Sequence, residues 1–276
     1  MQLLPVLLPR QAPFHLLIDE TRDVYIAPTL ARYRLWEPAE TALFLRLLRP
    51  GDRVVDVGAH VGYFTVLFSR LCGAGGFVHA FEPEPANYRL LRANLLVNDC
   101  RNVEALELAA SDAAGTEGLF LSPCNGGDHR LSFEEGRARC EVRTTRLDEA
   151  LGEQRVDFVK IDAQGAEPRI LQGMRGLVAR ERARVGVLAE FAPGLLERHA
   201  DGLAGFAELL GTLGARAFHP REAGGNLAVE PVPLPAGLQP IADALSARGE
   251  EDASTNLLLF FSDAAQRRHL ERLALS

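Results

Sequence analysis

Three short runs of apolar residues, each bounded by turn residues and ending at or near an acidic residue, stand out along the chain. They are residues 53–59 (RVVDVGA), 76–82 (GFVHAFE) and 156–162 (VDFVKID). Mostly apolar runs of this length are typical of strands buried on both faces of a parallel sheet. The pattern also predicts strands at 103–110, 185–191 and 256–261.

Segments with helical periodicity separate these runs. The segment 84–98 places apolar side chains on one helical face, and Pro85 suits a first helical turn because its missing N–H costs nothing there. The residues on that face are Tyr88, Leu91, Leu95 and Leu96. Further helices are expected at 38–48, 62–71, 167–182, 195–213 and 263–273. This alternation predicts an α/β fold with a doubly wound, mostly parallel sheet.

The segment 111–147 breaks this alternation. Glycines punctuate short polar and apolar stretches, which predicts an antiparallel insertion after the third strand, with a loop at 123–137. A second Gly- and Pro-rich stretch, 218–240, is expected to be a loop. We divide the chain into an N-terminal arm and helical lead-in, 1–49, and one domain, 50–276. The apolar start of the arm suggests an exchanged arm or a surface that pairs two copies in a homodimer.

Composition narrows the partners. The 276 residues are 47% apolar and 24% charged, as in a globular protein with a large core. Thirty basic against thirty-seven acidic residues give a net charge of −7, which does not favour binding to nucleic-acid phosphates or anionic lipid. Apolar stretches are far shorter than a membrane span. Four scattered cysteines without a CxxC pair favour a reducing cytoplasm and give neither a zinc ribbon nor a redox motif. No metal is implied, because the sequence has no cluster of His and carboxylates at ligand spacing.

The strongest chemical signal is the run VVDVGAHVGYF at 54–64, a strand followed by a glycine turn and a helix start. Gly58 and Gly62 allow a sharp turn and a close approach of a ligand to the backbone. The spacing D-x-G-x-x-x-G differs from the three-glycine pattern of dinucleotide sites. Asp56 lies two residues before the first glycine, where it would repel a pyrophosphate but could accept a hydrogen bond from an ammonium group.

Glu82 ends the next strand, where a carboxylate can accept hydrogen bonds from both hydroxyls of a ribose. One acid suited to an ammonium group and one suited to a ribose, without a phosphate site, fit S-adenosylmethionine. A nicotinamide oxidoreductase is disfavoured by the missing G-x-G and by the acid that precedes the turn.

Four segments in this order, DVGAHVGYFT, FEPEP, AASD and FVKIDAQGAEPRILQGM, resemble the FkbM family of S-adenosylmethionine-dependent methyltransferases. The resemblance covers residues 36–192. It implies a class I, Rossmann-like methyltransferase fold with a seven-stranded sheet whose last strand is antiparallel. It also implies methyl transfer, usually to an oxygen of a sugar or natural product.

The resemblance carries cofactor roles onto the matching residues. Those expected around the cofactor are Asp56, Gly58, His60, Gly62, Phe64, Glu82, Pro83, Ser111, Asp112 and Asp162. Many members of the family have Asn at position 60 and Glu at position 164, where this chain has His60 and Gln164.

Methyl transfer to an alcohol needs an aligned acceptor and a group that takes its proton. Asp162 is the first candidate for this base. Lys160 should lie on the same face of its strand and could hold either the carboxylate or the acceptor. His129 lies in a glycine-rich segment that resembles a family loop and is a further candidate. Glu190, Arg130 and Trp36 are candidate contacts for a small hydroxylated acceptor.

Two other functions remain open at this point. The first is a methyltransferase acting on RNA or on a protein side chain. An N/D-P-P-Y motif, frequent in amino-group methyltransferases of nucleic acids, is replaced here by DAQG at 162–165. The second is a non-catalytic domain that only binds S-adenosylmethionine.

Overall fold

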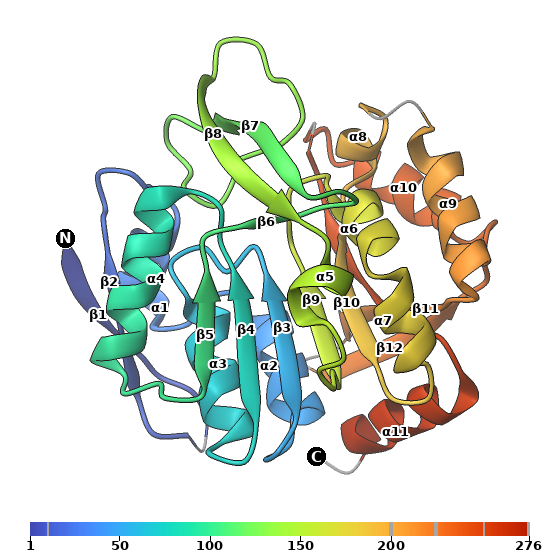
Figure 1. Ribbon diagram of the computed structural model, residues 1–276, viewed down its shortest axis with the longest axis horizontal. Coiled ribbons are helices and arrows are strands. Elements are labelled where there is room, and N and C mark those ends of the chain that lie inside the picture. The colour runs from blue at the N-terminus through green and yellow to red at the C-terminus, as the bar shows by residue number, and fades with distance from the viewer. Residues whose placement is uncertain (10, 199–200, 224–225, 251, 275–276) are drawn as a thin grey trace. The chain divides into compact units, whose positions relative to one another are not determined.

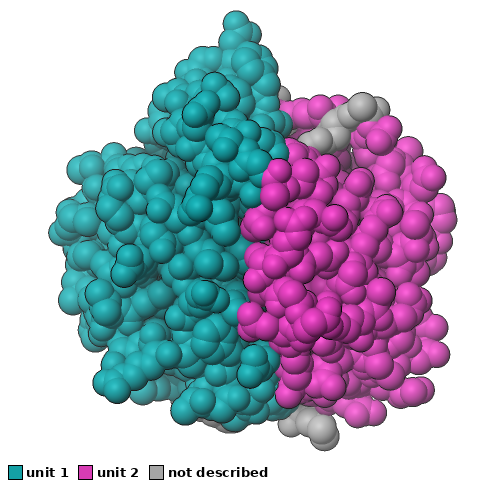
Figure 2. Space-filling model, in the orientation of Figure 1, with its two compact units in different colours: residues 1–109, 115–144 teal, residues 110–114, 145–276 magenta. Residues whose placement is uncertain are grey.

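The computed structural model describes residues 1–9, 11–198, 201–223, 226–250 and 252–274, and they form two compact units. Unit 1 contains residues 1–109 and 115–144, and unit 2 contains residues 110–114 and 145–276 (Figure 2). The first unit therefore holds the glycine turn together with the whole N-terminal arm. The second holds the strand that ends before Asp162.

Unit 1 is built on three parallel strands in the order β3-β4-β5 (Figure 1). Val54, Val55 and Val57 of β3 are almost completely buried, as its apolar pattern predicts. The elements are β3 (Arg53–Val57), β4 (Phe77–Phe81) and β5 (Val103–Leu106), with α1 (Ile26–Tyr33), α2 (Pro38–Leu47), α3 (Tyr63–Cys72) and α4 (Pro85–Val97).

The N-terminal arm, which had no clear pattern, forms an antiparallel hairpin of β1 (Gln2–Val6) and β2 (Phe14–Ile18). Phe14, Leu16 and Ile18 are fully buried, because alternate residues of β2 face the core of unit 1. Leu3 and Leu7 are about half exposed, so part of the apolar arm stays on the surface. Pairing of two copies through this arm remains a prediction.

The insertion contains the expected antiparallel pair, β7 (Gly115–Leu121) and β8 (Ala138–Thr145). It follows the short β6 (Ala109–Ala110). Leu119 and Val142 pack with Ala109 in a small apolar cluster of their own. The segment between the two strands folds back, since Phe120 and Arg130 form an isolated antiparallel bridge.

Unit 2 contains a second group of strands, in the order β9-β10-β13-β11-β12. Strands β9 and β10 are parallel, whereas β13 is antiparallel to β10 and to β11. The elements are α5 (Leu147–Leu151), β9 (Phe158–Ile161), α6 (Glu167–Gly173), α7 (Arg175–Arg180), β10 (Gly186–Phe191), α8 (Pro193–Leu196), α9 (Gly202–Leu213), β11 (Arg216–Ala223), β12 (Asn226–Val232), α10 (Leu238–Ser246), β13 (Thr255–Phe260) and α11 (Asp263–Ala274).

The α/β fold class is confirmed, but two details are corrected. The α/β strands described number eight rather than seven, and the extra one is β12. It pairs with β11 across residues 218–232, which had been expected to be loop. Proline is tolerated there because Pro220 lies beyond the part of β11 that pairs with β13, and Pro231 lies in the edge strand β12. Residues 224–225 lie outside the described part of the chain.

Three helical expectations also change. The helix at 167–182 is divided into α6 and α7 at Met174, and the one at 195–213 into α8 and α9, with 199–200 outside the described residues. In α4 the buried face carries Leu90, Asn94 and Leu95, while Leu96 is 81% exposed. Among the described helices, none has the length and apolar character needed to cross a bilayer.

Candidate functional site

The glycine turn after β3 is tied to the end of β4. The N–H groups of Gly58 and Ala59 both donate to the carbonyl of Phe81, at 3.1 and 3.0 Å. Gly58 and Gly62 have φ values of 78° and 93°, a region that favours glycine. A Cβ on Gly62 would lie 2.6 Å from Leu91 Cδ1 of α4, so the turn is also in close contact with that helix. The backbone therefore needs glycine at both positions.

Asp56 lies in β3 and is fully buried. Its Oδ2 accepts a hydrogen bond of 2.6 Å from the Thr65 hydroxyl, in the first turn of α3. This contact links the strand before the glycine turn to the helix after it. Asp56 therefore fixes the two ends of the turn relative to each other. A direct contact of Asp56 with an ammonium group remains a prediction.

Glu82 follows β4 and is 5% exposed. Its Oε2 accepts a hydrogen bond of 2.8 Å from the His60 N–H, and its Oε1 accepts one of 2.9 Å from the Glu84 N–H. Burial raises the pKa of Glu82 to about 7, although these two hydrogen bonds act in the opposite direction. The carboxylate is thus held beside the glycine turn, with each oxygen able to accept a further hydrogen bond. These two acceptor oxygens fit the hydroxyls of a ribose, which would donate to them.

His60 has a φ of 51°, and its side chain meets a segment far away in the sequence. Its Nε2 lies 3.5 Å from Oδ2 of Asp23, which is 3% exposed. A Cβ on Gly126 would lie 2.8 Å from the same nitrogen. The carbonyl of Gly126 accepts a hydrogen bond of 2.8 Å from the Asn87 side chain in α4.

Two more contacts hold these segments together. The N–H of Val24 donates to the carbonyl of Cys124 at 3.2 Å. Arg22 forms an ion pair of 3.2 Å with Glu84, the residue that caps α4. We call residues 22–24 and 124–126 the clasp. Its two segments lie against His60 and Glu84, the residues whose N–H groups hold Glu82.

His129 lies in the insertion loop. Its Nδ1 accepts a hydrogen bond of 3.0 Å from the Ser122 N–H. Burial lowers the pKa of His129, which favours the neutral ring, and the proton of that ring then sits on Nε2. This geometry disfavours the expected role of His129 as a base, because the ring's one lone pair is already engaged.

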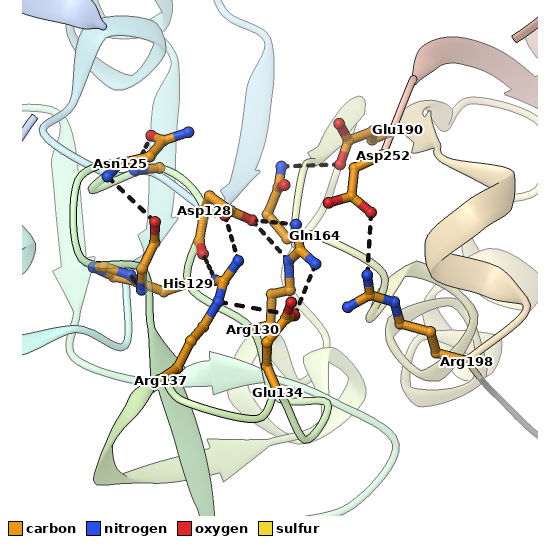
Figure 3. Close-up of polar contacts among 12 residues, drawn as sticks. Asn125, Asp128, His129, Arg130, Glu134, Arg137, Gln164, Glu190, Arg198 and Asp252 are labelled. Atoms are coloured by element: carbon orange, nitrogen blue, oxygen red, sulfur yellow. Dashed lines mark hydrogen bonds and ion pairs between the residues drawn. The ribbon is translucent and has the colours of Figure 1, made fainter. Parts of the chain in front are cut away.

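Arg130 is 2% exposed and forms ion pairs within its own loop (Figure 3). Its guanidinium contacts Asp128 Oδ1 at 2.7 Å and Glu134 Oε2 at 2.9 Å. Arg137 binds the other carboxylate oxygen of Asp128, also at 2.7 Å. These contacts shape the loop between β7 and β8. A contact of Arg130 with an acceptor remains a prediction.

The other expected residues of unit 1 are in less specific surroundings. Phe64 is buried and packs its ring against Phe44 and Phe68, so the structure gives it a core role. Trp36 is half-buried and donates through its backbone N–H to the Tyr63 hydroxyl at 3.4 Å. Pro83 is half-buried between Glu82 and Glu84. Cofactor contacts of Phe64 and Pro83 and an acceptor contact of Trp36 remain predictions.

In unit 2, the candidate base Asp162 follows β9. Its Oδ2 contacts Lys160 Nζ at 2.9 Å, and its Oδ1 accepts a hydrogen bond of 3.0 Å from Gln164. The same Gln164 nitrogen donates to Glu190 Oε2 at 3.0 Å (Figure 3). The Gln164 amide therefore connects two carboxylates, that of Asp162 just after β9 and that of Glu190 near the end of β10. Lys160 is 4% exposed and so acts as a buried partner of Asp162.

Glu167 supports the same loop and was missed from the sequence. It is 1% exposed, and its Oε1 accepts a hydrogen bond of 2.9 Å from the Ala163 N–H. Burial raises the pKa of Glu167 to about 7, and the charge on Asp162 acts in the same direction. The sequence signal that could have identified it is an acidic residue in the first turn of α6, four positions after Ala163 in the preceding loop.

Ser111 and Asp112 also belong to unit 2. Ser111 is fully buried, and its hydroxyl donates to Asp112 Oδ1 at 3.0 Å. Arg169 contacts the same oxygen at 2.8 Å. Burial would raise the pKa of Asp112, but the hydrogen bonds from Arg169 and Ser111 outweigh it and lower that pKa. Whether this pair contacts an adenine remains a prediction.

Sequence reasoning also missed Asp23 and Asn87. Both lie outside the recognised motifs, and each meets its partner only through the fold. In the described part of the chain, no group of three or more His, Cys, Asp or Glu side chains could hold a metal ion.

Comparison with known proteins gives the family. Residues 56–224, more than half of the chain, match the family described as "Methyltransferase FkbM domain". "Methyltransferase sdnD" of Sordaria araneosa is 30% identical, over 44% of this chain and 60% of that protein. "31-O-demethyl-FK506 methyltransferase FkbM" of Streptomyces tacrolimicus is 31% identical, over 46% and 61%. The chain thus matches about three fifths of the length of these relatives.

Among solved structures, the O-methyltransferase TomG from Streptomyces achromogenes covers 82% of this chain and 79% of its own. The two structures align with a TM-score of 0.45 at 15% identity. The family match confirms the resemblance seen in the motifs. The chain belongs to the FkbM family of S-adenosylmethionine-dependent methyltransferases.

Proposed function

We propose that this protein transfers a methyl group from S-adenosylmethionine to a hydroxyl group of a small acceptor, a sugar or a natural product. The observation that carries the proposal is the placement of Glu82 beside the glycine turn, held by the N–H groups of His60 and Glu84. The relative from Streptomyces tacrolimicus, whose name states methylation of a 31-O-demethyl compound, supports the choice of oxygen.

The cofactor would supply a methyl group already activated on a sulfonium, so the protein has to bind, align and exclude water. Glu82 would accept hydrogen bonds from the ribose hydroxyls. The turn from Gly58 to Gly62 would bring backbone N–H groups close to the ligand at the start of α3. Asp56 and Thr65 would keep this turn in place from both sides.

Asp162 would take the proton of the acceptor hydroxyl. A carboxylate is a weak base in water, and its orientation therefore matters for proton transfer. Lys160 and Gln164 each hold one oxygen of Asp162, so the carboxylate has a defined orientation. Glu190, bound to the same Gln164 amide, would contact the acceptor. Ser111 and Asp112 are proposed for the adenine side of the cofactor.

The test begins with calorimetric titration of S-adenosylhomocysteine, with NAD as the control. Saturable binding of the first and none of the second supports the cofactor site. Labelled S-adenosylmethionine is then offered with hydroxylated small molecules, with RNA and with protein extracts. Transfer of the label to RNA or protein would mean that the acceptor is a macromolecule and not a small molecule. Binding of S-adenosylhomocysteine without any methyl transfer would favour a domain that only binds the cofactor.

A further inference from the structure

Helix α4 contains Asn94 and is capped one turn later by Asn98, and both side chains bind the backbone of the N-terminal hairpin. Asn94 Oδ1 accepts from the Leu17 N–H at 2.6 Å, and its Nδ2 donates to the Leu17 carbonyl at 3.0 Å. Asn98 makes the same pair of contacts with His15, at 3.1 and 2.7 Å. The two side chains therefore occupy the edge of β2 as a neighbouring strand would.

One contact distinguishes the two asparagines. Asn94 Nδ2 also donates to the carbonyl of Val61, in the glycine turn, at 2.7 Å. The second hydrogen bond of Asn98 Nδ2 goes instead to the carbonyl of Asn94 within α4. Asn94 thus connects the hairpin with the turn, whereas Asn98 connects the hairpin with the helix alone.

The orientation of the Asn94 amide is fully determined. Its nitrogen faces two carbonyls and its oxygen faces one N–H, so exchanging the two atoms would break all three hydrogen bonds. The side chain is completely buried, and a lost partner would leave a polar group without water. Gly62 contacts Leu91 on the same helix, so α4 supports the turn at two points.

From these contacts we propose that Asn94 is a positioning residue for the cofactor turn. It holds the Val61 carbonyl, and thereby the backbone between Gly58 and Gly62, in the conformation that binds S-adenosylmethionine. The N-terminal hairpin reinforces this conformation through the same amide. The inference rests on the proposed function, because it assumes that the turn binds the cofactor.

The test compares Asn94→Ala with Asn98→Ala in the full chain. Both variants release two hydrogen bonds to β2, so both lower the free energy of unfolding measured in urea. Calorimetric titration with S-adenosylhomocysteine is done where each variant is folded. We expect Asn94→Ala to raise the Kd roughly tenfold or more, about what the loss of one buried hydrogen bond gives, and Asn98→Ala to leave it within about twofold.

A second pair tests the same contact by repulsion instead of deletion. Asn94→Asp and Asn98→Asp keep the acceptor for the strand N–H and place a carboxylate oxygen against the carbonyls. Only the first opposes Val61, so only it should weaken binding. Equal weakening within both pairs would overturn the inference and leave the proposed function standing. A wild-type protein that bound no S-adenosylhomocysteine would overturn both.

Discussion

The N–H of His60 donates to Glu82 Oε2 at 2.8 Å, so a residue of the glycine turn holds the acid that follows the next strand. The two residues are 22 positions apart, and parallel pairing of β3 with β4 brings them together. The turn and the acid therefore form one structural feature. A ligand that shifts either would shift the other.

The first prediction concerns the pH dependence of cofactor binding. Burial raises the pKa of Glu82 to about 7, and only its ionised form accepts two hydroxyl hydrogen bonds freely. The affinity for S-adenosylhomocysteine should therefore rise roughly tenfold between about pH 6 and pH 8. Glu82→Gln should bind weakly without this dependence. Calorimetry across this range checks it, and a flat wild-type profile would contradict it.

The same shift has a consequence for the stability of the unliganded protein. The ordinary pKa of this group is 4.5, and in the folded protein it is about 7. At a pH between these two values, the folded state retains a proton on Glu82 that the unfolded state releases. This group's contribution to the free energy of unfolding therefore falls as pH rises through that range. The free energies of unfolding of wild type and Glu82→Gln, measured in urea, should therefore diverge progressively as the pH rises through this range. Parallel curves would show that Glu82 titrates normally.

The second prediction concerns Asp162. Asp162→Asn keeps the shape of the side chain and removes the proton acceptor. We expect kcat for methyl transfer to fall about 10²- to 10⁴-fold, with the Kd for S-adenosylhomocysteine little changed. Single-turnover assays and calorimetry separate the two effects. Unchanged turnover would show that Asp162 is not the base.

The third prediction concerns Gln164, whose amide donates to both Asp162 and Glu190. A donor to a carboxylate favours its charged form, so Gln164→Leu should move the acidic limb of the pH–rate profile to higher pH. Gln164→Glu, which adds a third carboxylate, should move it further. Because Gln164 has a φ of 51°, Gln164→Gly is the control for backbone strain. If the acidic limb moves equally in the Gly and Leu variants, the shift results from loss of the Gln164 amide. If the limb does not move in either variant, the amide does not influence the ionisation.

The fourth prediction concerns Thr65. Thr65→Val removes the hydroxyl that donates to buried Asp56 at almost constant volume. We expect the free energy of unfolding to fall by about 1–3 kcal/mol, as for a buried carboxylate that loses a donor. Thr65→Ser retains the hydroxyl and should preserve most of the wild-type free energy of unfolding. Urea denaturation measures both variants, and similar losses in the two would point to packing of the methyl group instead.

The fifth prediction concerns the clasp. A Cβ on Gly126 would lie 2.8 Å from His60 Nε2, whereas one on Gly127 would lie 3.4 Å or more from any neighbour. Gly126→Ala should separate the insertion loop from His60 and loosen the hydrogen bond from Val24 to Cys124. Hydrogen exchange of the Val24 amide should then accelerate, with Gly127→Ala as the matched control. Equal exchange in both variants would show that the clasp tolerates the change.

The local sequence was sufficient to predict those elements whose conformation is specified by their own residues. The apolar run of β3, the glycines of the turn and Pro85 at the start of α4 specify their conformations through burial, positive φ and a fixed proline ring. The hairpin of β11 and β12 was missed, because Gly- and Pro-rich strands at a sheet edge resemble loops in sequence.

The motifs in the sequence determined the family and the cofactor class, and they predict roles for the acids Asp56, Glu82 and Asp162. Tertiary structure alone decided what holds them. Asn94 reaches Leu17 across 77 residues, and Asp23 reaches His60 across 37, which no local pattern encodes. Such polar contacts depend on tertiary packing, since burial makes an unpaired amide or carboxylate costly and so favours the fold that pairs it.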